Sequence, residues 1–348
     1  MKIQNGDVIF NECDMNFVSK LGLIEATEMV LDFKSQYKLP FIFDTYQLAD
    51  FLSVGRKKLF EVTKNSNDMY MKTRIPKRSG GTRELSVPNL SLKHIQKKIN
   101  RYLLRHVPIS KYATAYYKGA KLKNNAQVHT GKKYLLKMDL SDFFSNIRFG
   151  MVYSSAFNTR YFPKQIGTML TTLCCKDDVL PQGAPTSPAL SNIVMKFFDD
   201  NFGAWCENRG FSYTRYCDDI TVSGNTSLYP AYQKAKGWLE NMGFEINERK
   251  THFITNANRQ TVTGLTVNEK VSVTSDYKRK LRQEIYYALK YGLENAVIHE
   301  NLSKYIYDET VDTYRYYCYL IGKIKFVLSI EKDNEYFKNA VVKLKDMI

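Results

Sequence analysis

Residues 211–222 read FSYTRYCDDITV, and at their centre Tyr216-Cys217-Asp218-Asp219 sets two adjacent carboxylates between stretches rich in aromatic and β-branched residues. This pattern predicts two short strands joined by a tight turn that carries both carboxylates. By itself, an Asp-Asp pair on a turn is more often a solvated surface feature than a functional site. Its meaning therefore depends on which other residues join it.

A third carboxylate could complete a metal site with this pair. Residues 134–139 form a short apolar run that ends in Asp139, which predicts a strand with an acid at its end. If that end lies beside the turn, Asp139, Asp218 and Asp219 supply the hard oxygen ligands that Mg²⁺ prefers. Phosphoryl transfer from a nucleoside triphosphate commonly uses two such ions, roughly 3.5 to 4 Å apart. The pattern is consistent with a site for two magnesium ions.

Positive charge is concentrated in one part of the chain. The net charge is +16, but residues 54–137 alone hold 21 Lys and Arg against three acids, a net +18, which leaves the remainder at −2. Tyr112, Tyr116 and Tyr117 lie within the same segment. Basic side chains neutralise phosphates and aromatic rings stack on bases, so the segment predicts a nucleic-acid-binding surface. A membrane surface or an acidic protein is the alternative partner.

Other classes of protein fit the sequence less well. No apolar run reaches the roughly 18 residues that would span a bilayer, and residues 1–14 show no basic region followed by an apolar stretch. We therefore expect a cytoplasmic protein with no membrane partner. The six cysteines show no Cys-x-x-Cys spacing, so we expect reduced core residues rather than disulfides or zinc ligands.

The order of the predicted elements indicates an α+β fold. Apolar residues recur at helical spacing in residues 15–65 and 89–106, and a basic turn containing Gly80 and Gly81 joins two β-type stretches as a hairpin. Further elements are expected as helices at 190–202 and 231–242, as strands on both sides of the Asp-Asp turn, at 244–247 and at 251–255, and as helices after residue 275.

Three motifs occur in the order and spacing of reverse transcriptases and particularly resemble those of bacterial retrons. They are residues 137–144 (KMDLSDFF), residues 180–188 (LPQGAPTSP) and residues 216–219 (YCDD). The resemblance covers roughly residues 70–275 and implies a right-hand polymerase with fingers, palm and helical thumb subdomains. It divides the chain into an N-terminal helical segment (1–65), fingers and palm (66–275) and a helical thumb (276–348).

The resemblance also implies a role for individual residues. The two magnesium ions would be held by Asp139, Asp218 and Asp219 and by the backbone carbonyl of Leu140. Lys250 would be the general acid near the leaving pyrophosphate. The deoxynucleoside triphosphate (dNTP) would be bound by Lys77, Arg83, Leu140, Phe144 and Gln182.

Within the nucleotide site, Phe144 matches the bulky side chain that lies under the sugar and obstructs a 2′-hydroxyl, whereas Phe143 is the better candidate for the core. Arg83 and Lys77 would grip the triphosphate, although Arg78 or Lys72 could serve instead of Lys77. The loop with Gln182 would pack against the nascent base pair, with the following glycine permitting close approach. Cys217 departs from the family pattern, in which alanine is usual.

Two short motifs narrow the resemblance to retrons: residues 125–129 (NAQVH) fit an NAxxH pattern and residues 262–264 a VTG pattern. The RNA-binding residues implied are Asn125, Ala126, His129, Val262, Thr263 and Gly264. On its own, His129 would more often be a structural histidine. The resemblance implies that the enzyme binds its own structured noncoding RNA and starts DNA synthesis from the 2′-hydroxyl of an internal guanosine. The product would be a branched RNA–DNA molecule (msDNA), which acts in antiphage defence with an effector protein from the same locus.

Alternative functions remain open at this point. Another bacterial defence reverse transcriptase or a group II intron-like enzyme would share the polymerase motifs, although the tail after residue 275 shows no Cys/His or His-Asn-His nuclease pattern. A different class of function is a scaffold that binds RNA or an effector, with polymerisation secondary or lost. The intact Asp139, Asp218, Asp219 and Arg83 argue against loss of catalysis.

Overall fold

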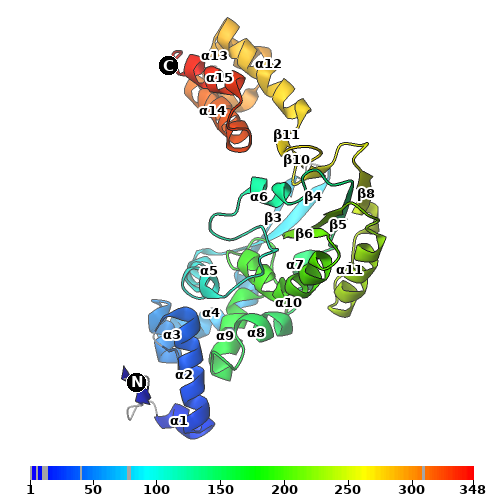
Figure 1. Cartoon of the computed structure of the whole chain (residues 1–348). Helices are drawn as coiled ribbons and strands as arrows, with labels where there is room; N and C mark the ends of the chain where they lie inside the picture. Colours follow the sequence, from blue (N-terminus) through cyan, green and yellow to red (C-terminus); the bar gives the residue numbers. More distant parts are fainter. Residues whose placement is uncertain (1, 5–6, 10–14, 40, 77–79, 308–309) are drawn as a thin grey trace.

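The computed structural model describes residues 2–4, 7–9, 15–39, 41–76, 80–307 and 310–348. Helices of the N-terminal part lie at one end of the molecule, a four-stranded sheet with its helices lies in the middle, and a second helical unit lies at the other end (Figure 1). The mixture of helices with an antiparallel sheet confirms the predicted α+β class.

The N-terminal part begins with a short hairpin and continues as helices, as predicted for residues 15–65. Its elements are β1 (Lys2–Gln4), β2 (Asp7–Ile9), α1 (Met15–Leu21), α2 (Leu23–Tyr37), α3 (Thr45–Phe51) and α4 (Arg56–Lys64). Asp44 caps the N-terminus of α3, and its carboxylate accepts a 2.8 Å hydrogen bond from the backbone N–H of Gln47. Helix α2 buries Phe33 and Tyr37 against Phe162, which joins this part to the middle of the molecule.

The predicted hairpin and the helix after it are confirmed. Strands β3 (Tyr70–Pro76) and β4 (Thr82–Pro88) pair antiparallel, and α5 (Leu90–Tyr102) follows after the 3₁₀ turn η2 (Ser66–Met69) and the hairpin. The side chain of Asn89 caps α5 by accepting a 3.0 Å hydrogen bond from the backbone N–H of Leu92.

The central sheet contains β5 (Tyr134–Asp139), β6 (Ser212–Tyr216), β7 (Asp219–Gly224) and β8 (His252–Thr255) in the order β6-β7-β5-β8. All neighbours are antiparallel, and the register sets Asp139 opposite Asp219. The prediction of a strand at 244–247 is wrong. Residues 244–247 pair with the sheet only through one bridge between Ile246 and Leu140, because the chain then turns at once into the 3₁₀ turn η4 (Glu248–Lys250).

Helices surround this sheet. They are α6 (Leu122–Gln127), α7 (Phe143–Asn146), α8 (Phe149–Ala156), α9 (Lys164–Cys174), α10 (Ser187–Glu207) and α11 (Tyr229–Asn241), and the 3₁₀ turn η3 (Leu104–His106) follows α5. The long helix α10 packs against β6, α8 and α11. Helix α10 extends the helix predicted at 190–202 at both ends, and α11 begins two residues before and ends one residue before the helix predicted at 231–242. Helices α8 and α9 were not predicted.

The chain after the central sheet forms the second helical unit. A small sheet of β9 (Thr261–Val262), β10 (Leu265–Thr266) and β11 (Ser272–Val273) leads into it. Its remaining elements are α12 (Ser275–Tyr291), α13 (Leu293–His299), η5 (Ser303–Tyr305), β12 (Ile306–Tyr307), β13 (Thr310–Val311), α14 (Thr313–Ile330) and α15 (Glu335–Lys345). This confirms the prediction of a helical chain after residue 275.

Buried apolar side chains form two cores. The first runs from the N-terminal helices to the central sheet, and the second fills the C-terminal unit. The second core also contains Ala126 of α6, Leu135 of β5 and Val262 of β9. Residues of the NAxxH and VTG motifs therefore lie where the C-terminal unit meets the central region.

The cysteines that the structure describes are free thiols. Cys174, Cys175, Cys206 and Cys217 are buried, as predicted, and Cys318 is exposed. Cys13 lies outside the described residues.

Among the residues that the structure describes, no helix is both long enough and apolar enough to cross a bilayer.

Candidate active site

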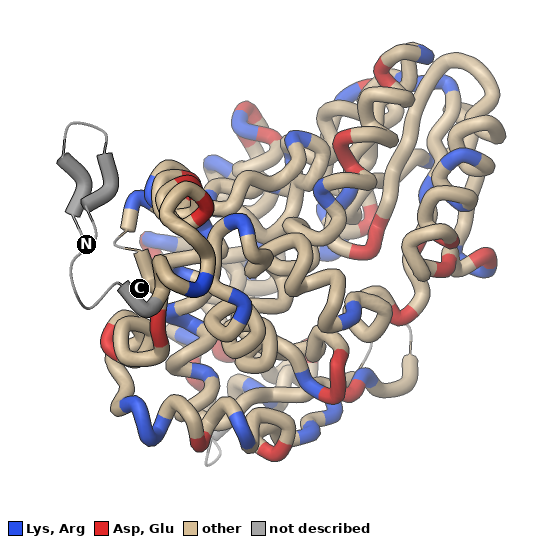
Figure 2. Tube along the Cα trace, turned by 90° about the horizontal axis from the view of Figure 1, so that it is seen from below, with Lys and Arg blue, Asp and Glu red and all other residues tan. Residues whose placement is uncertain are grey.

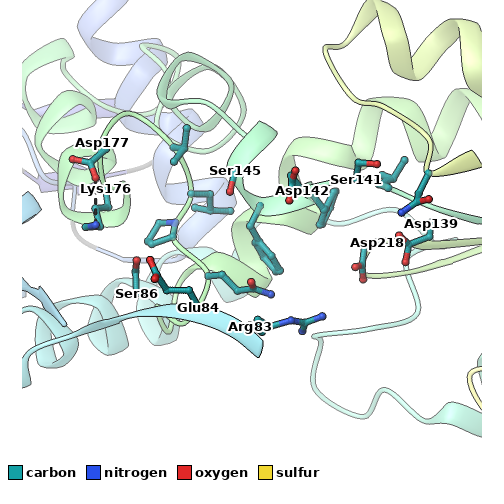
Figure 3. Close-up of a pocket in the computed structure, with 18 of the residues that line it drawn as sticks. Arg83, Glu84, Ser86, Asp139, Ser141, Asp142, Ser145, Lys176, Asp177 and Asp218 are labelled. Atoms are coloured by element: carbon teal, nitrogen blue, oxygen red, sulfur yellow. Dashed lines mark ion pairs between the residues drawn. The ribbon is translucent and has the colours of Figure 1, made fainter. Parts of the chain in front are cut away.

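A cavity of about 660 Å³ lies between the β3–β4 hairpin and the end of the central sheet (Figure 3). It brings together residues that five separate segments contribute. The predicted site residues along its wall are Arg83, Asp139, Leu140, Phe144, Gln182, Asp218 and Lys250.

The carboxylates meet at one end of the sheet. Tyr216 pairs with Asp219 across the β6–β7 hairpin, so Cys217 and Asp218 form its two-residue turn. Asp139, at the end of β5, lies opposite Asp219 in the neighbouring register, and the backbone N–H of Leu140 donates a 3.1 Å hydrogen bond to the Asp218 carbonyl. Figure 3 shows the side chains of Asp139 and Asp218 next to each other. The pairing of the strands therefore brings Asp139 next to Asp218 and Asp219, as expected from the sequence.

Negative charge accumulates at this end of the sheet. Partial removal from bulk water and then the charge of Asp218 raise the pKa of Asp219 to about 6, and Asp139 adds to the effect. Lys137 and Lys250 oppose it. The three carboxylates are thus close enough to repel one another, and a cation among them would be stabilised.

Lys250 supplies one cation to the cluster. Its ammonium group lies 2.9 and 3.1 Å from the two carboxylate oxygens of Asp139. These hydrogen bonds raise the pKa of Lys250, which therefore carries its proton at neutral pH. A protonated amine beside the carboxylates has the chemistry of a general acid.

The donor set suits a hard divalent cation, although the residues that the structure describes contain no group of three His, Cys, Asp or Glu side chains already arranged to hold a metal. Three carboxylates offer oxygen ligands only, which is the preference of magnesium-type ions. The raised pKa of Asp219 marks negative charge that such an ion would neutralise. An ion bound to Asp139 would compete with the ammonium of Lys250 for the same oxygens.

Two neighbouring phenylalanines differ in burial. Phe143 is 3% exposed and packs against Phe244, with ring centroids 5.8 Å apart. Phe144 is only half-buried and lines the cavity, in edge contact with Phe143. This placement agrees with a core role for Phe143, while the role of Phe144 against the nucleotide sugar stays a prediction.

The loop that precedes α10 is fastened to the hairpin. The backbone N–H of Ser86 in β4 donates a 2.8 Å hydrogen bond to the Gln182 carbonyl. Gly183 has a φ of +126°, and a Cβ there would lie 2.9 Å from the carbonyl oxygen of Ser86. Gly183 therefore lets the loop pack closely against strand β4. This packing fixes the position of Gln182 in the cavity wall.

Arg83 is exposed and extends from β4 toward the side of the cavity that holds Asp218 (Figure 3). The neighbouring Glu84 is engaged by Lys72 at 2.9 Å, so its charge is compensated on its own hairpin. Lys77 lies outside the described residues.

Basic side chains of the segment 54–137 are exposed on two helices. They include Arg56, Lys57 and Lys58 on α4 and Lys97 and Arg101 on α5. In the view from below, Lys and Arg recur along much of the trace (Figure 2). Helix α5 is tied to the loop before α10 because the amide of Asn100 donates a 2.9 Å hydrogen bond to the Pro185 carbonyl. Helix α5, which carries part of this basic surface, is thus joined to the loop that contributes Gln182 to the cavity wall.

The NAxxH and VTG motifs meet in the interior. The Asn125 amide donates a 3.3 Å hydrogen bond to the Thr263 hydroxyl, and its oxygen accepts a 2.9 Å hydrogen bond from Thr114. Asn125, Ala126, His129 and Val262 are each at most 1% exposed, whereas Thr263 is partly exposed and Gly264 is exposed. Thr263 and Gly264 have φ of +46° and +82° and form the two-residue turn between β9 and β10.

His129 bridges two strands of the central sheet. Its ring nitrogens lie 2.8 Å from Ser223 Oγ in β7 and 2.8 Å from Thr214 Oγ1 in β6. Burial, together with the nearby charge of Lys132, lowers the pKa of His129 to about 3. The imidazole is therefore neutral at physiological pH, with one nitrogen as donor and the other as acceptor.

Sequence reasoning missed several residues around the site. Lys176 and Asn247 line the cavity, and Arg215 is fully buried and donates a hydrogen bond to the carbonyl of Cys217 in the β6–β7 turn. The only signal for Arg215 is its position immediately before Tyr216, which does not reveal what it contacts.

Comparisons with known proteins identify the family of the chain. The family "Reverse transcriptase (RNA-dependent DNA polymerase)" matches residues 75–277. The chain is 33% identical to the retron Ec83 reverse transcriptase of Escherichia coli over 66% of its own length and 78% of that protein. Identity to the retron Ec86 enzyme of E. coli is 28%, over 70% of this chain and 73% of that protein.

A relative from Myxococcus xanthus is longer. The chain is 32% identical to the retron Mx65 reverse transcriptase over 62% of its own length, and it spans 55% of the length of that protein. The family match and these identities confirm the predicted polymerase fold. This chain belongs to the reverse transcriptase family, RNA-directed DNA polymerases, and within it to the retron reverse transcriptases.

Proposed function

We propose that the chain copies its own structured noncoding RNA into DNA, beginning at the 2′-hydroxyl of an internal guanosine and leaving a branched msDNA. The observation that supports this most is the gathering of Asp139, Asp218, Arg83 and Phe144 around one cavity, in a chain whose matched relatives are retron enzymes. The priming step and the branched product are the parts of the proposal that need an experiment.

The acidic end of the sheet would hold two Mg²⁺ ions, which when bound would stabilise the attacking and the leaving oxygens of phosphoryl transfer. The ligands would be Asp139, Asp218, Asp219 and the carbonyl of Leu140. The ammonium of Lys250, which lies at Asp139, would deliver a proton to the departing pyrophosphate.

The incoming dNTP would occupy the cavity. Arg83 would hold the triphosphate with its guanidinium fork, and Lys77 would add a second positive charge. The half-buried ring of Phe144 would lie under the sugar and exclude a 2′-hydroxyl. Gln182, positioned by the hydrogen bond between its carbonyl and Ser86, would contact the nascent pair.

Template, primer and product would lie against the basic surface and the C-terminal unit. We assign residues 66–275 as fingers and palm, 276–348 as a thumb, and 1–65 as an N-terminal helical segment. The exposed Lys and Arg of α4 and α5 would neutralise phosphates of the RNA.

The two retron motifs would contribute to RNA recognition in different ways. The turn of the partly exposed Thr263 and the exposed Gly264 is the part that can touch RNA directly. Asn125, Ala126, His129 and Val262 are buried, so they would act by holding that turn and the adjoining strands in place.

In the cell, the complex of enzyme and msDNA would act in antiphage defence with an effector protein from the same locus, in the cytoplasm. A scaffold function is the alternative, in which the protein holds RNA or the effector and polymerisation is secondary.

The test is to express the protein with its flanking locus, to isolate the associated nucleic acid and to treat it with RNA-debranching enzyme. A species that loses its RNA–DNA junction on debranching is the expected result, and Asp218→Asn/Asp219→Asn should abolish it. Recovery of linear DNA only would reject 2′-hydroxyl priming. If the double variant still protects cells fully against phage, the scaffold function is correct and catalysis is dispensable.

A further inference from the structure

Cys217 carries a backbone conformation that its residue type does not favour. Its φ is +62°, in the left-handed region that non-glycine residues adopt rarely. Such a conformation persists only where the surrounding structure holds it. Because Cys217 lies between Tyr216 and Asp218, whatever holds it also sets the direction of the catalytic carboxylates.

One contact to Cys217 comes from a buried arginine. Arg215 is fully buried, and its Nη1 donates a 3.0 Å hydrogen bond to the carbonyl oxygen of Cys217. The same guanidinium forms a fork with Asp199 of α10, with Nε at 2.9 Å and Nη2 at 2.6 Å from the two carboxylate oxygens. A bidentate pair fixes the plane of the guanidinium, and so fixes the direction of the third bond to Cys217.

The ion pair is itself held by neighbours. Tyr213 donates a 2.6 Å hydrogen bond to Asp199, and the Asn192 oxygen accepts a 3.2 Å hydrogen bond from Arg215. The Asn192 amide then donates to the carbonyl of Ala115 at 2.7 Å. Buried polar groups that are satisfied in this way keep a single geometry.

A second contact to Cys217 comes from the loop that contains Ala115. The hydroxyl of Tyr116 donates a hydrogen bond to the Cys217 sulfur, with 3.1 Å between oxygen and sulfur. Tyr116 is also in the left-handed region, with a φ of +65°. The loop is anchored beside the turn because the backbone N–H of Thr114 donates a 2.8 Å hydrogen bond to the carbonyl of Arg215.

We propose that Arg215 and Tyr116 are positioning residues for polymerisation, which hold the turn through the carbonyl and the thiol of Cys217 and so aim Asp218 into the cavity. Alanine at position 217 would leave Tyr116 without its acceptor, so the second contact belongs to the cysteine that this chain carries. The proposal concerns nucleotide addition on any template. It is therefore tested separately from 2′-hydroxyl priming.

The thiol contact is tested with Tyr116→Phe, Cys217→Ala and the double variant, assayed on poly(rA) primed with oligo(dT). Each single change removes the same hydrogen bond, which corresponds to a fall in kcat of about two- to tenfold. The double variant should be no slower than the slower single variant. Tyr46→Phe, an exposed tyrosine of α3, is the matched control and should keep the wild-type kcat. Single variants with wild-type rates, or effects that multiply in the double variant, would overturn this part.

The arginine contact needs a paired variant, because Arg215→Met alone would leave Asp199 as an unpaired buried charge. Arg215→Met/Asp199→Asn removes both charges and keeps an acceptor for the Tyr213 hydroxyl. We expect a folded protein with kcat at least tenfold lower and a half-saturating Mg²⁺ concentration several-fold higher.

Two further variants keep this test decisive. Arg215→Lys retains a positive charge for Asp199 but lacks the guanidinium fork that also reaches Cys217. It should show the same rise in the half-saturating Mg²⁺ concentration, and it replaces the pair variant in the test if the pair variant does not fold. Lys323→Met/Glu284→Gln removes another largely buried ion pair, in the C-terminal unit, and should lower the melting temperature without changing half-saturating Mg²⁺. A folded Arg215 variant with wild-type kcat and wild-type Mg²⁺ dependence would refute the proposal.

Discussion

The side chain of Asn125 is hydrogen-bonded to Thr263 at 3.3 Å, although 138 positions separate the two residues in the sequence. The bond joins helix α6 to the turn between β9 and β10. Since Ala126 and Val262 lie in the core of the C-terminal unit, the two motifs form one junction between that unit and the central sheet.

Asn125→Ala should therefore destabilise the junction. The change leaves the buried hydroxyl of Thr114 without its Asn125 partner and removes the bond to Thr263, so we expect the free energy of unfolding to fall by about 1–3 kcal/mol. Urea unfolding followed by circular dichroism measures this. Asn124→Ala, at the exposed neighbouring position of α6, should change the stability by less than about 0.5 kcal/mol. Equal losses in the two variants would contradict the role of the bond.

The buried His129 predicts a pH dependence of stability. Its pKa in the folded protein is about 3, below the ordinary value of 6.5, so between these pH values the unfolded chain binds a proton that the folded chain does not. Its contribution to stability is complete above pH 6.5 and is lost as the pH falls toward 3, by up to about 1.4 kcal/mol per pH unit.

His129→Gln should therefore lose less stability on acidification than the wild type, over the range from pH 6.5 to the lowest pH at which both proteins fold. Denaturant unfolding at a series of pH values gives the comparison. His94→Gln, at an exposed position of α5, should follow the wild-type curve. If the His129 variant and the wild type have parallel curves, the histidine is not held neutral.

The parts of the fold that local sequence determines were predicted well. The hairpin β3–β4 and strand β5 follow from β-type runs bounded by turn residues, and Asp139 could be expected beside Asp218 because one lies at a strand end and the other on a hairpin turn. Helices α8 and α9 were missed.

Contacts between distant segments were beyond sequence reasoning. The burial of His129 and Asn125 depends on strands and turns far away in the chain, and the ion pair of Arg215 with Asp199 joins β6 to α10. Residue type and spacing indicate that such groups need partners, but the partners are set by the tertiary structure.

Phe144→Ala should relax the choice of sugar. The ring lines the cavity, and its removal opens the space that a 2′-hydroxyl would need. We expect the ratio of kcat/KM for ribonucleotides over deoxynucleotides to rise at least tenfold, measured by single-nucleotide extension. Phe157→Ala is the matched control. It should lower stability by about 3–5 kcal/mol without changing that ratio, because Phe157 is fully buried in the core and does not line the cavity. An unchanged ratio for Phe144→Ala would show that this ring does not exclude nucleotides with a 2′-hydroxyl.

Lys250→Gln separates two functions that the contact with Asp139 could serve. If the ammonium gives its proton to pyrophosphate, kcat should fall about 10²-fold or more even at saturating Mg²⁺. If it only neutralises Asp139, a metal ion can take over that function, and kcat should recover once Mg²⁺ saturates the site. In both cases half-saturating Mg²⁺ should not rise, because the variant no longer competes with the ion for the Asp139 oxygens.

The matched control for this prediction is Lys236→Gln. Lys236 pairs with Glu248 at 2.7 Å, two residues before Lys250, and its removal takes away a neighbouring positive charge without touching Asp139. Its kcat at saturating Mg²⁺ should stay within about twofold of the wild type, since an exposed ion pair contributes little. A kcat loss in Lys250→Gln that persists at saturating Mg²⁺ and is absent from Lys236→Gln would assign the proton transfer to Lys250. If both variants lose kcat equally, the loss would instead come from the changed electrostatic field around the η4 turn.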